Sequence, residues 1–285
     1  MKIPTPTLIA EQVATALAED VGSGDLTACL LPEETQASAQ VIVRQSAVLC
    51  GADWFHEVFR QLHHQIGLTW LHQDGDTVST GDCICTLTGP ARALLTGERT
   101  ALNFLQTLSG TASAAAHYVQ AVQGFPVMIC DTRKTLPGLR LAQKYAVVCG
   151  GASNQRMGLY DVVLLKENHI QAAGSVTQAL VAAQAVSAAD TMIQIEVENL
   201  AELEEALVAG AASILLDNFT LTDLRQAVAL NQQRARLEAS GGISLSNVRQ
   251  VAETGVDAIS VGDLTKDLQA VDFSMRFLPD KAVCD

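Results

Sequence analysis

The 285-residue sequence has few positive charges, no closely spaced cysteine motif and no apolar segment at its start. Its net charge of −13 argues against a general binder of nucleic acids or of anionic membranes. Seven cysteines are scattered without a Cys-x-x-Cys motif, so we expect reduced, mostly buried thiols rather than a zinc knuckle. Because the first residues lack the apolar core of a signal peptide, we expect a cytoplasmic protein.

Other familiar segments are also missing. Residues 101–130 contain no Asp, Glu, Lys or Arg, but their amides, serines and glycines make them too polar for a membrane span. The sequence contains no G-x-G-x-x-G and no P-loop, which argues against the nucleotide-binding folds that depend on these motifs. The turns at 74–76 and 80–82 are like those of biotinyl and lipoyl modules, but the lysine hairpin of those modules is absent.

The N-terminal part has the pattern of a small α+β region. Apolar spacing and turn residues predict a helix over 8–19, a strand over 40–49, a helix over 52–65, hairpins within 68–87, a helix over 94–109 and a connector helix over 112–124.

From residue 125 onward a strand-plus-helix pattern repeats. Strand-like apolar runs, each followed by a polar or glycine step and a helical segment, occur at 127–130, 162–165, 192–197, 213–216, 236–239 and 258–261. Successive strand ends are 21 to 33 residues apart, which is the length of one strand-plus-helix unit. Six such units in series predict a parallel α/β barrel rather than an open, doubly wound sheet.

The ends of these strands carry charge in a definite order. The stretch from Asp131 to Gly138 follows the first strand and places two cations at its end, before Pro137 and Gly138 turn the chain into a helix over 139–148. In a parallel barrel all strand C-terminal ends meet at one rim. That rim would carry cations early and carboxylates later: Arg133, Lys134, Arg156 and Lys166, then Glu196 and Asp217.

These residue types suit a ligand with several negative groups. Arginine and lysine bind carboxylates, arginine through two parallel hydrogen bonds. Rim carboxylates favour Mg²⁺, which keeps several waters and bridges substrate phosphates. The bare backbone N–H groups of Ser240-Gly241-Gly242 and of Gly262 suit a terminal phosphate. A small ligand with carboxylates and a magnesium-bound diphosphate would satisfy every part of the rim.

Each residue also has a simpler explanation when it is considered alone. Arg99 could be an exposed surface cation, Lys166 could pair with Glu167 in solvent, and Asp217-Asn218 could cap the next helix. Only one of Glu196 and Glu198 could point inward, His169 could be a packed loop residue, and Gly241-Gly242 could be a plain turn. The common position on one rim favours the functional interpretation over these separate ones.

Eight segments, in order over nearly the whole chain, resemble the quinolinate phosphoribosyltransferase family, the decarboxylating enzymes of de novo NAD synthesis. They are LLTGERTALNFLQTLSG, DTRKTLPGLR, QKYAVVCGG, LLKENHI, IEVEN, LLDNF, SGGI and ISVGDLTK. The resemblance implies an α/β fold with an N-terminal sandwich domain over 1–112 and an incomplete barrel of six or seven strands over 113–271. It also implies that the tail, about 272–285, packs back on the first domain.

The resemblance implies a role for particular residues. Quinolinate and phosphoribosyl pyrophosphate would be bound by Arg133, Lys134, Gln155, Arg156, Lys166, Ser240, Gly241 and Gly262, together with Arg99 donated across the interface of a homodimer. Lys134, Lys166, Glu196 and Asp217 would be catalytic, with Mg²⁺ held by Glu196 and Asp217 through water. No covalent enzyme intermediate is needed.

One position departs from the family pattern. Where the family usually has His-Arg, this chain reads Asn154-Gln155-Arg156. Glutamine can still donate a hydrogen bond to a carboxylate but brings no charge. Two alternatives stay open at this point. One is a non-catalytic relative that binds a small carboxylate or oxyanion, which Gln155 makes conceivable, and the other is a barrel enzyme that forms a Schiff base through Lys166.

Overall fold

The computed structural model describes residues 4–188 and 190–279, which divide into two compact units. Within the described residues, the first unit comprises residues 4–116, 136–151 and 268–279. The second unit comprises His117–Thr135 and Ala152–Asp267. Within the described residues, no helix combines the length and the apolar character that a membrane crossing requires.

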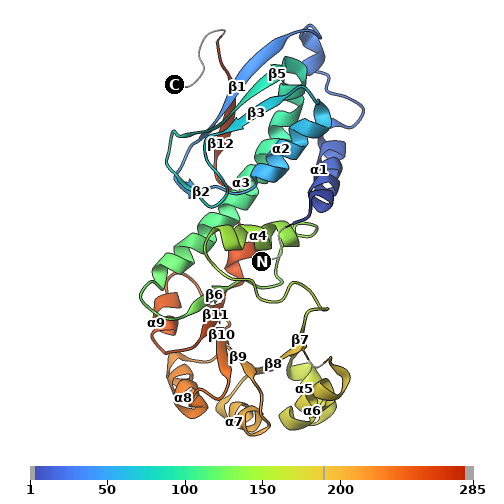
Figure 1. Ribbon diagram of the computed structural model, residues 1–285. Helices are drawn as coiled ribbons and strands as arrows, with labels where there is room; N and C mark the ends of the chain where they lie inside the picture. The colour runs from blue at the N-terminus through green and yellow to red at the C-terminus, as the bar shows by residue number, and fades with distance from the viewer. Residues whose placement is uncertain (1–3, 189, 280–285) are drawn as a thin grey trace. The chain divides into compact units, whose positions relative to one another are not determined.

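The first unit combines helices with antiparallel strands. Its elements are α1 (Pro6–Val21), the 3-10 helix η1 (Ala28–Leu30), β1 (Gln36–Val43), β2 (Ala47–Val48), α2 (Ala52–Leu62), β3 (Gly67–Trp70), β4 (Thr77–Val78), β5 (Cys83–Pro90), most of α3 (Ala91–Ala121), α4 (Arg140–Cys149) and β12 (Phe273–Phe277). Four strands form a sheet in the order β12-β1-β5-β3, and β2 pairs separately with β4. Figure 1 shows β12, from the far end of the sequence, beside β1.

Amphipathic helices cover the apolar face of this sheet. In α1 the residues Ile9, Val13 and Leu17 recur every four positions and are buried, as helical periodicity requires. In β1 the buried residues alternate, which is the period of a strand with one covered face. Both sets belong to one apolar core, and each large aliphatic side chain buried there contributes about 1.5–3 kcal/mol.

The second unit is built on a parallel sheet. Its elements are β6 (Met128–Cys130), β7 (Val162–Leu165), α5 (Glu167–Ala173), α6 (Val176–Val186), β8 (Met192–Val197), α7 (Leu200–Val208), β9 (Ser213–Asp217), α8 (Leu221–Asn231), β10 (Arg236–Ser240), α9 (Val248–Ala252), β11 (Ala258–Ser260) and α10 (Asp263–Lys266).

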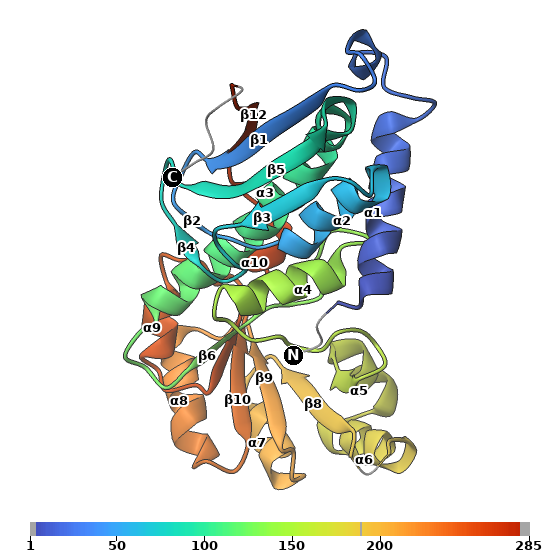
Figure 2. The same ribbon diagram turned by 45° about the horizontal axis from the view of Figure 1, so that its top comes forward.

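Six strands in the order β6-β11-β10-β9-β8-β7 make up this sheet, and every pairing in it is parallel. Figure 2 shows the strands with α5, α6, α7 and α8 flanking them. The α/β fold class is confirmed, with an antiparallel sheet in the first unit and a six-stranded parallel sheet in the second. Because β6 and β7 end the order without pairing with each other, the barrel is incomplete.

Two expectations about the elements differ from the structure. The helices expected over 94–109 and 112–124 are one continuous helix, α3, since no proline or left-handed glycine interrupts the chain between them. Leu136–Gly151, expected in the barrel domain, belongs to the first unit, because Ala142 and Ala146 of α4 pack in its core. The part of the expected tail at 280–285 lies outside the described residues.

Candidate active site

The C-terminal ends of the parallel strands surround a cavity of about 400 Å³. Since parallel strands end at the same edge of a sheet, residues far apart in the sequence converge there. The cavity is lined by Thr132, Arg133, Lys134, Gln155, Arg156, Leu164, Lys166, Glu196, Leu215, Asp217, Ser240 and Ser260. Four cations and two carboxylates therefore face one space, as the order of charges along the sequence predicted.

Three expected residues lie outside this lining. Gly241 follows Ser240 and lines a neighbouring cavity of about 280 Å³. Gly262 lies beside the Lys134 side chain, since a Cβ added at Gly262 would be 3.3 Å from Lys134 Cδ. Arg99 is an exposed residue of α3 in the first unit and does not line the cavity.

The two arginines of the cavity are arranged for an anion. The Nε atom of Arg133 is buried and has no hydrogen-bond partner among the described residues. Burial, and then the neighbouring Arg133 charge, lower the pKa of Arg156. Two partly desolvated guanidinium groups that repel each other bind a carboxylate or phosphate strongly, because the ligand supplies the missing hydrogen bonds and counter-charge.

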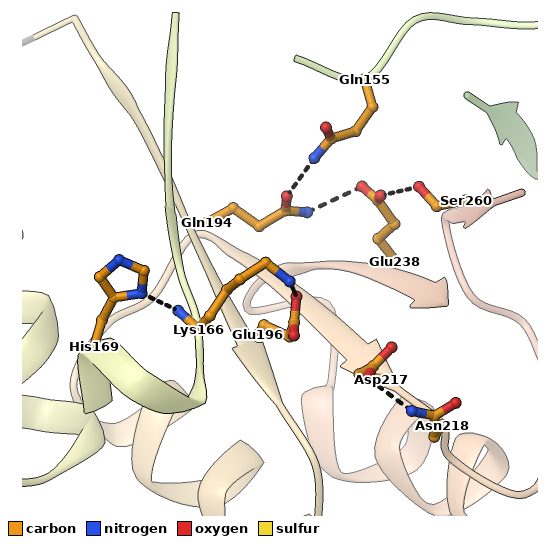
Figure 3. Close-up of polar contacts among 9 residues, drawn as sticks. All are labelled: Gln155, Lys166, His169, Gln194, Glu196, Asp217, Asn218, Glu238 and Ser260. Carbon is orange, nitrogen blue, oxygen red and sulfur yellow. Dashed lines mark hydrogen bonds and ion pairs between the residues drawn. The ribbon is translucent and has the colours of Figure 1, made fainter. Parts of the chain in front are cut away.

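Lys166 forms an ion pair with Glu196, at 2.6 Å between Nζ and Oε2, as Figure 3 shows. The alternative in which Lys166 pairs with Glu167 is therefore wrong. The Glu196 carboxylate is largely covered, whereas the Lys166 side chain keeps 46% of its surface exposed. A lysine held in this way presents a charged ammonium to a ligand.

His169 has a structural function at the start of α5. Its Nδ1 accepts a hydrogen bond from the Lys166 backbone N–H at 3.0 Å, which caps the first turn of the helix. Glu198, the second carboxylate considered on β8, is exposed and is absent from the cavity lining. A hydrogen bond with Glu167 raises the pKa of Glu198. Of the two acids, Glu196 is the one that points inward.

Asp217 does not cap the next helix, so its carboxylate is available to a ligand. The N-terminal cap of α8 is Thr220, whose side chain accepts a hydrogen bond from the Asp223 N–H. Asp217 instead accepts one from the Asn218 side chain at 2.7 Å. Glu196 and Asp217 together offer carboxylate oxygens as hard donors, and among the described residues they are not part of a group of three or more metal-binding side chains. That donor set fits Mg²⁺, which binds through few carboxylates and retains water.

Three polar residues that the sequence analysis missed, Gln194, Glu238 and Ser260, form a hydrogen-bonded chain with Gln155 at the cavity (Figure 3). Gln155 Nε2 donates to Gln194 Oε1 at 3.0 Å, and Gln194 Nε2 donates to Glu238 Oε2 at 3.0 Å. The Ser260 hydroxyl donates to the other oxygen of Glu238. Gln194 and Glu238 are buried, and each lies between two apolar residues of its strand, which was the signal in the sequence that could have identified them.

The loop after β10 needs its glycine. Gly241 has φ +94°, and a Cβ there would lie 2.8 Å from the Asn218 backbone nitrogen and closer still to its side chain. The neighbouring Gly242 also has positive φ, +60°, but a Cβ there would meet nothing within 4 Å. The two glycines are therefore more than a plain turn, because Gly241 allows Asn218 and the loop to approach closely.

Two family models match the chain almost from end to end. The model described as "Quinolinate phosphoribosyl transferase, N-terminal domain" matches residues 25–109. The model described as "Quinolinate phosphoribosyl transferase, C-terminal domain" matches residues 111–276.

Named relatives and a solved structure agree with these matches. A Bacillus subtilis protein named "Probable nicotinate-nucleotide pyrophosphorylase [carboxylating]" is 39% identical over 257 residues, covering 90% of this chain and 89% of its own. A Homo sapiens protein named "Nicotinate-nucleotide pyrophosphorylase [carboxylating]" is 39% identical, covering 95% of this chain and 92% of its own. The structure of the nicotinate-nucleotide pyrophosphorylase from Francisella tularensis superposes with a TM-score of 0.94 at 42% identity, covering 97% and 98% of the two chains.

Proposed function

The chain belongs to the quinolinate phosphoribosyltransferase family, and from this membership we infer that it transfers the phosphoribosyl group of phosphoribosyl pyrophosphate to quinolinate. The reaction is decarboxylating and yields nicotinate mononucleotide, diphosphate and CO₂ in de novo NAD biosynthesis. The observation that carries this function is the cavity in which four cations and two carboxylates meet, from several strand ends and from the loop between α4 and β7. Family membership and the named relatives support this enzyme over a non-catalytic anion binder and over a Schiff-base enzyme.

The cations of the cavity are proposed to hold the two substrates. Arg133 and Arg156 pair with the quinolinate carboxylates, and the buried, unpartnered Nε of Arg133 supports this assignment. Lys134 and Lys166 lie along the same cavity and neutralise phosphate or carboxylate charge. Each arginine can form two parallel hydrogen bonds with a carboxylate and so fix the orientation of the pyridine ring, whereas each lysine provides a positive charge on a flexible side chain.

Glu196 and Asp217 are proposed to hold Mg²⁺ through water. When bound, the ion would neutralise the charge that develops on the diphosphate leaving group. The ion pair with Lys166 orients the Glu196 carboxylate toward the cavity. The hydrogen bond from Asn218 does the same for Asp217.

The terminal phosphate of the sugar is proposed to lie at the loops after β10 and β11. Ser240, Gly241 and Gly262 offer backbone N–H groups there without bulky side chains. The closeness of Lys134 to Gly262 adds a positive charge beside that loop. Such loops at late strand ends are common phosphate sites in parallel barrels.

The proposed reaction follows from the positions in which the cavity would hold the two substrates. Diphosphate leaves C1′ of the ribose, the carbon develops oxocarbenium character, and the pyridine nitrogen attacks it. The ribosylated ring is then a pyridinium, whose positive nitrogen stabilises the electron pair left on C2 when the adjacent 2-carboxylate leaves as CO₂, and a proton from solvent then adds to C2. The residues of the cavity position and neutralise charge, and no bond to the protein forms.

A cytoplasmic homodimer is proposed in which Arg99 completes the partner's site. Arg99 is exposed on α3, in a segment that carries the family motif and outside the cavity of its own chain. An exposed guanidinium at this position is accessible to a substrate bound by the partner, which it would hold by charge-assisted hydrogen bonds.

Gln155 is proposed to bind a substrate carboxylate by a hydrogen bond without charge. It lines the cavity, and its amide is oriented by the hydrogen bond to Gln194. Because glutamine does not ionise, the binding of quinolinate at this position should not change with pH between 5 and 8, unlike that of relatives with histidine here.

The function is tested by mixing the purified enzyme with quinolinate, phosphoribosyl pyrophosphate and Mg²⁺. Nicotinate mononucleotide and CO₂ should appear in equal amounts. Arg133→Ala and Arg156→Ala should each lower kcat/KM by about 30- to 900-fold, corresponding to about 2–4 kcal/mol of lost transition-state binding. A matched control is Arg249→Ala, which removes an exposed arginine that pairs with Glu253 outside the cavity.

Two outcomes would contradict the proposal. One is the absence of CO₂ release by wild-type protein that binds quinolinate, which would indicate a binding protein. The other is unchanged kcat and KM in Arg133→Ala, which would remove this residue from the site.

A further inference from the structure

Three side chains of metal-binding type meet in the first unit. Cys50 lies between β2 and α2, Asp74 lies in the turn between β3 and β4, and Cys149 is the last residue of α4. One ligand atom from each, two Sγ and a carboxylate oxygen, lie within 4.8 Å of one another. None of the three lines the cavity of the second unit, so the reaction does not account for them.

The surrounding structure fixes this cluster. The Cys50 N–H donates to Ser109 Oγ at 2.9 Å, and the same hydroxyl donates to the Cys50 carbonyl at 3.1 Å. Asp74 Oδ1 accepts from the Ala52 N–H at 3.1 Å. The Tyr145 hydroxyl donates to Asp74 Oδ2 at 3.0 Å. These hydrogen bonds therefore hold three separate segments of chain in place around the two sulfur atoms without a bound ligand.

The electrostatic environment leaves the cluster short of positive charge. Burial raises the pKa of the fully covered Cys50 thiol and also that of the Asp74 carboxyl. The Cys50 thiol, acting as a hydrogen-bond donor, lowers the pKa of Cys149. A cation placed among the three groups would stabilise both thiolates and the carboxylate together.

We propose that Cys50, Asp74 and Cys149 bind a thiophilic divalent metal ion of the zinc class, with Tyr145 as the residue that orients Asp74. In a tetrahedral zinc site, bonds of about 2.3 Å to sulfur and about 2.1 Å to oxygen place two ligand atoms about 3.6–3.8 Å apart. The ligand atoms of the cluster lie within 4.8 Å of one another, so side-chain movements of about 1 Å bring them to that separation. Two thiolates and one carboxylate favour zinc over magnesium, and water takes the fourth position.

Metal binding has two consequences here. The ion replaces the thiol protons, which are released to solvent, so binding strengthens as the pH rises. The ion also links the end of α4 to the α2 start and to the β3–β4 turn, so it should raise the melting temperature of the protein. This site does not depend on the proposed reaction.

The test uses Co²⁺ as a coloured probe of the full-length, reduced and chelator-treated protein. Thiolate ligation should give a charge-transfer absorption in the near ultraviolet that saturates at one Co²⁺ per chain. Zn²⁺ should abolish this band and excess Mg²⁺ should not, because Mg²⁺ does not compete for thiolates. The carboxylates Glu196 and Asp217 cannot produce the band, so binding at the catalytic cavity is distinguished.

Variants identify the ligands. Cys149→Ser and Asp74→Asn should lose or strongly weaken the band, and Tyr145→Phe should bind about tenfold more weakly through the loss of its hydrogen bond to Asp74. Cys29→Ser removes an exposed thiol outside the cluster and should keep the band unchanged. Cys149 is only half-buried, so its replacement tests the site without removing the fully buried Cys50.

Melting curves give a second measurement. Zn²⁺ should raise the melting temperature of wild type and of Cys29→Ser, but not that of Cys149→Ser. The proposal is overturned if reduced wild type shows no thiolate band with excess Co²⁺, or if the band persists in both Cys149→Ser and Asp74→Asn. It is also overturned if the two thiols only form a disulfide and bind no metal after reduction.

Discussion

Glu238 is a buried carboxylate in β10, and its hydrogen bonds determine how Gln155 faces the cavity. Ser260 donates to one oxygen, Gln194 donates to the other, and Arg236 lies 3.5 Å away. Because Gln194 must turn its N–H₂ toward Glu238, its carbonyl oxygen must face Gln155. A residue outside the cavity lining thereby sets the amide orientation of one that lines the cavity.

Gln194→Leu should destabilise the protein by about 1–3 kcal/mol, because it leaves the Glu238 carboxylate and the Gln155 amide each without one buried partner. Thermal melts measure the change. Gln184→Leu, on the exposed face of α6, is the matched control and should leave the melting temperature nearly unaltered. Equal effects of the two substitutions would show that the network does not stabilise the fold.

Asp25 provides a prediction about pH. Its carboxylate accepts hydrogen bonds from the backbone N–H groups of Ala28 and Thr27 and from the Thr96 hydroxyl, and these lower its pKa. A lowered pKa in the folded state means that ionised Asp25 stabilises the fold above its ordinary pKa. That contribution is lost as the pH falls through the lower, folded value.

Asp25→Asn should therefore melt at a lower temperature than wild type at pH 7, and the gap should shrink between about pH 5 and pH 3. Melting temperatures of both proteins across this range measure it. A gap that stays constant down to pH 3 would show that ionisation of Asp25 is not the cause.

The elements of the second unit were largely predictable, and the reason is physical. Strands of a parallel sheet tend to be covered on both faces, so β7 appears in the sequence as a continuous apolar run and β8 as a mainly apolar one, both with the bounds observed. The charges at the strand ends converge because every strand runs the same way. The common direction of the strands therefore predicted that Arg133, Lys166, Glu196 and Asp217 would face one cavity, and all four line it.

Apart from the packing of the tail on the first domain, which the family resemblance implied, contacts between distant segments were not predictable. The alternation in β12 does not reveal that its partner is β1, and α4 gives no local sign that it packs in the first unit. The cluster of Cys50, Asp74 and Cys149 was not predictable for the same reason, since the distances between these residues along the sequence match no metal-binding motif. Only tertiary structure places such residues together.

The loop between β10 and α9 offers a matched pair of substitutions. Gly241→Ala should raise the KM for phosphoribosyl pyrophosphate at least about tenfold, because the added methyl group displaces Asn218 and the proposed phosphate loop. Gly242→Ala has free space and costs only about 1–2 kcal/mol of backbone strain. Steady-state kinetics of both variants, compared with melting temperatures, separate the site from stability. Similar KM values in the two variants would rule out the role of Gly241.

At the scale of the whole molecule, the proposed dimer makes a prediction about mixed subunits. Arg99→Ala and Arg133→Ala should each be nearly inactive alone. If Arg99 serves the partner's site, unfolding and refolding the two together yields hybrid dimers with one intact site, and about a quarter of wild-type activity should return. Activity that remains at the level of the separate variants would place Arg99 in its own chain's site or outside any site.

The pairing of β12 with β1 has a consequence for synthesis of the chain. β1, the first strand to be made, pairs with β12, and residues 273–277 leave the ribosome after every other strand that the structure describes. Until then one edge of β1 exposes unpaired N–H and carbonyl groups, to which other strands can add. The nascent N-terminal sheet therefore stays open to such additions until β12 is made, and a chain truncated before residue 273 would keep that edge unpaired.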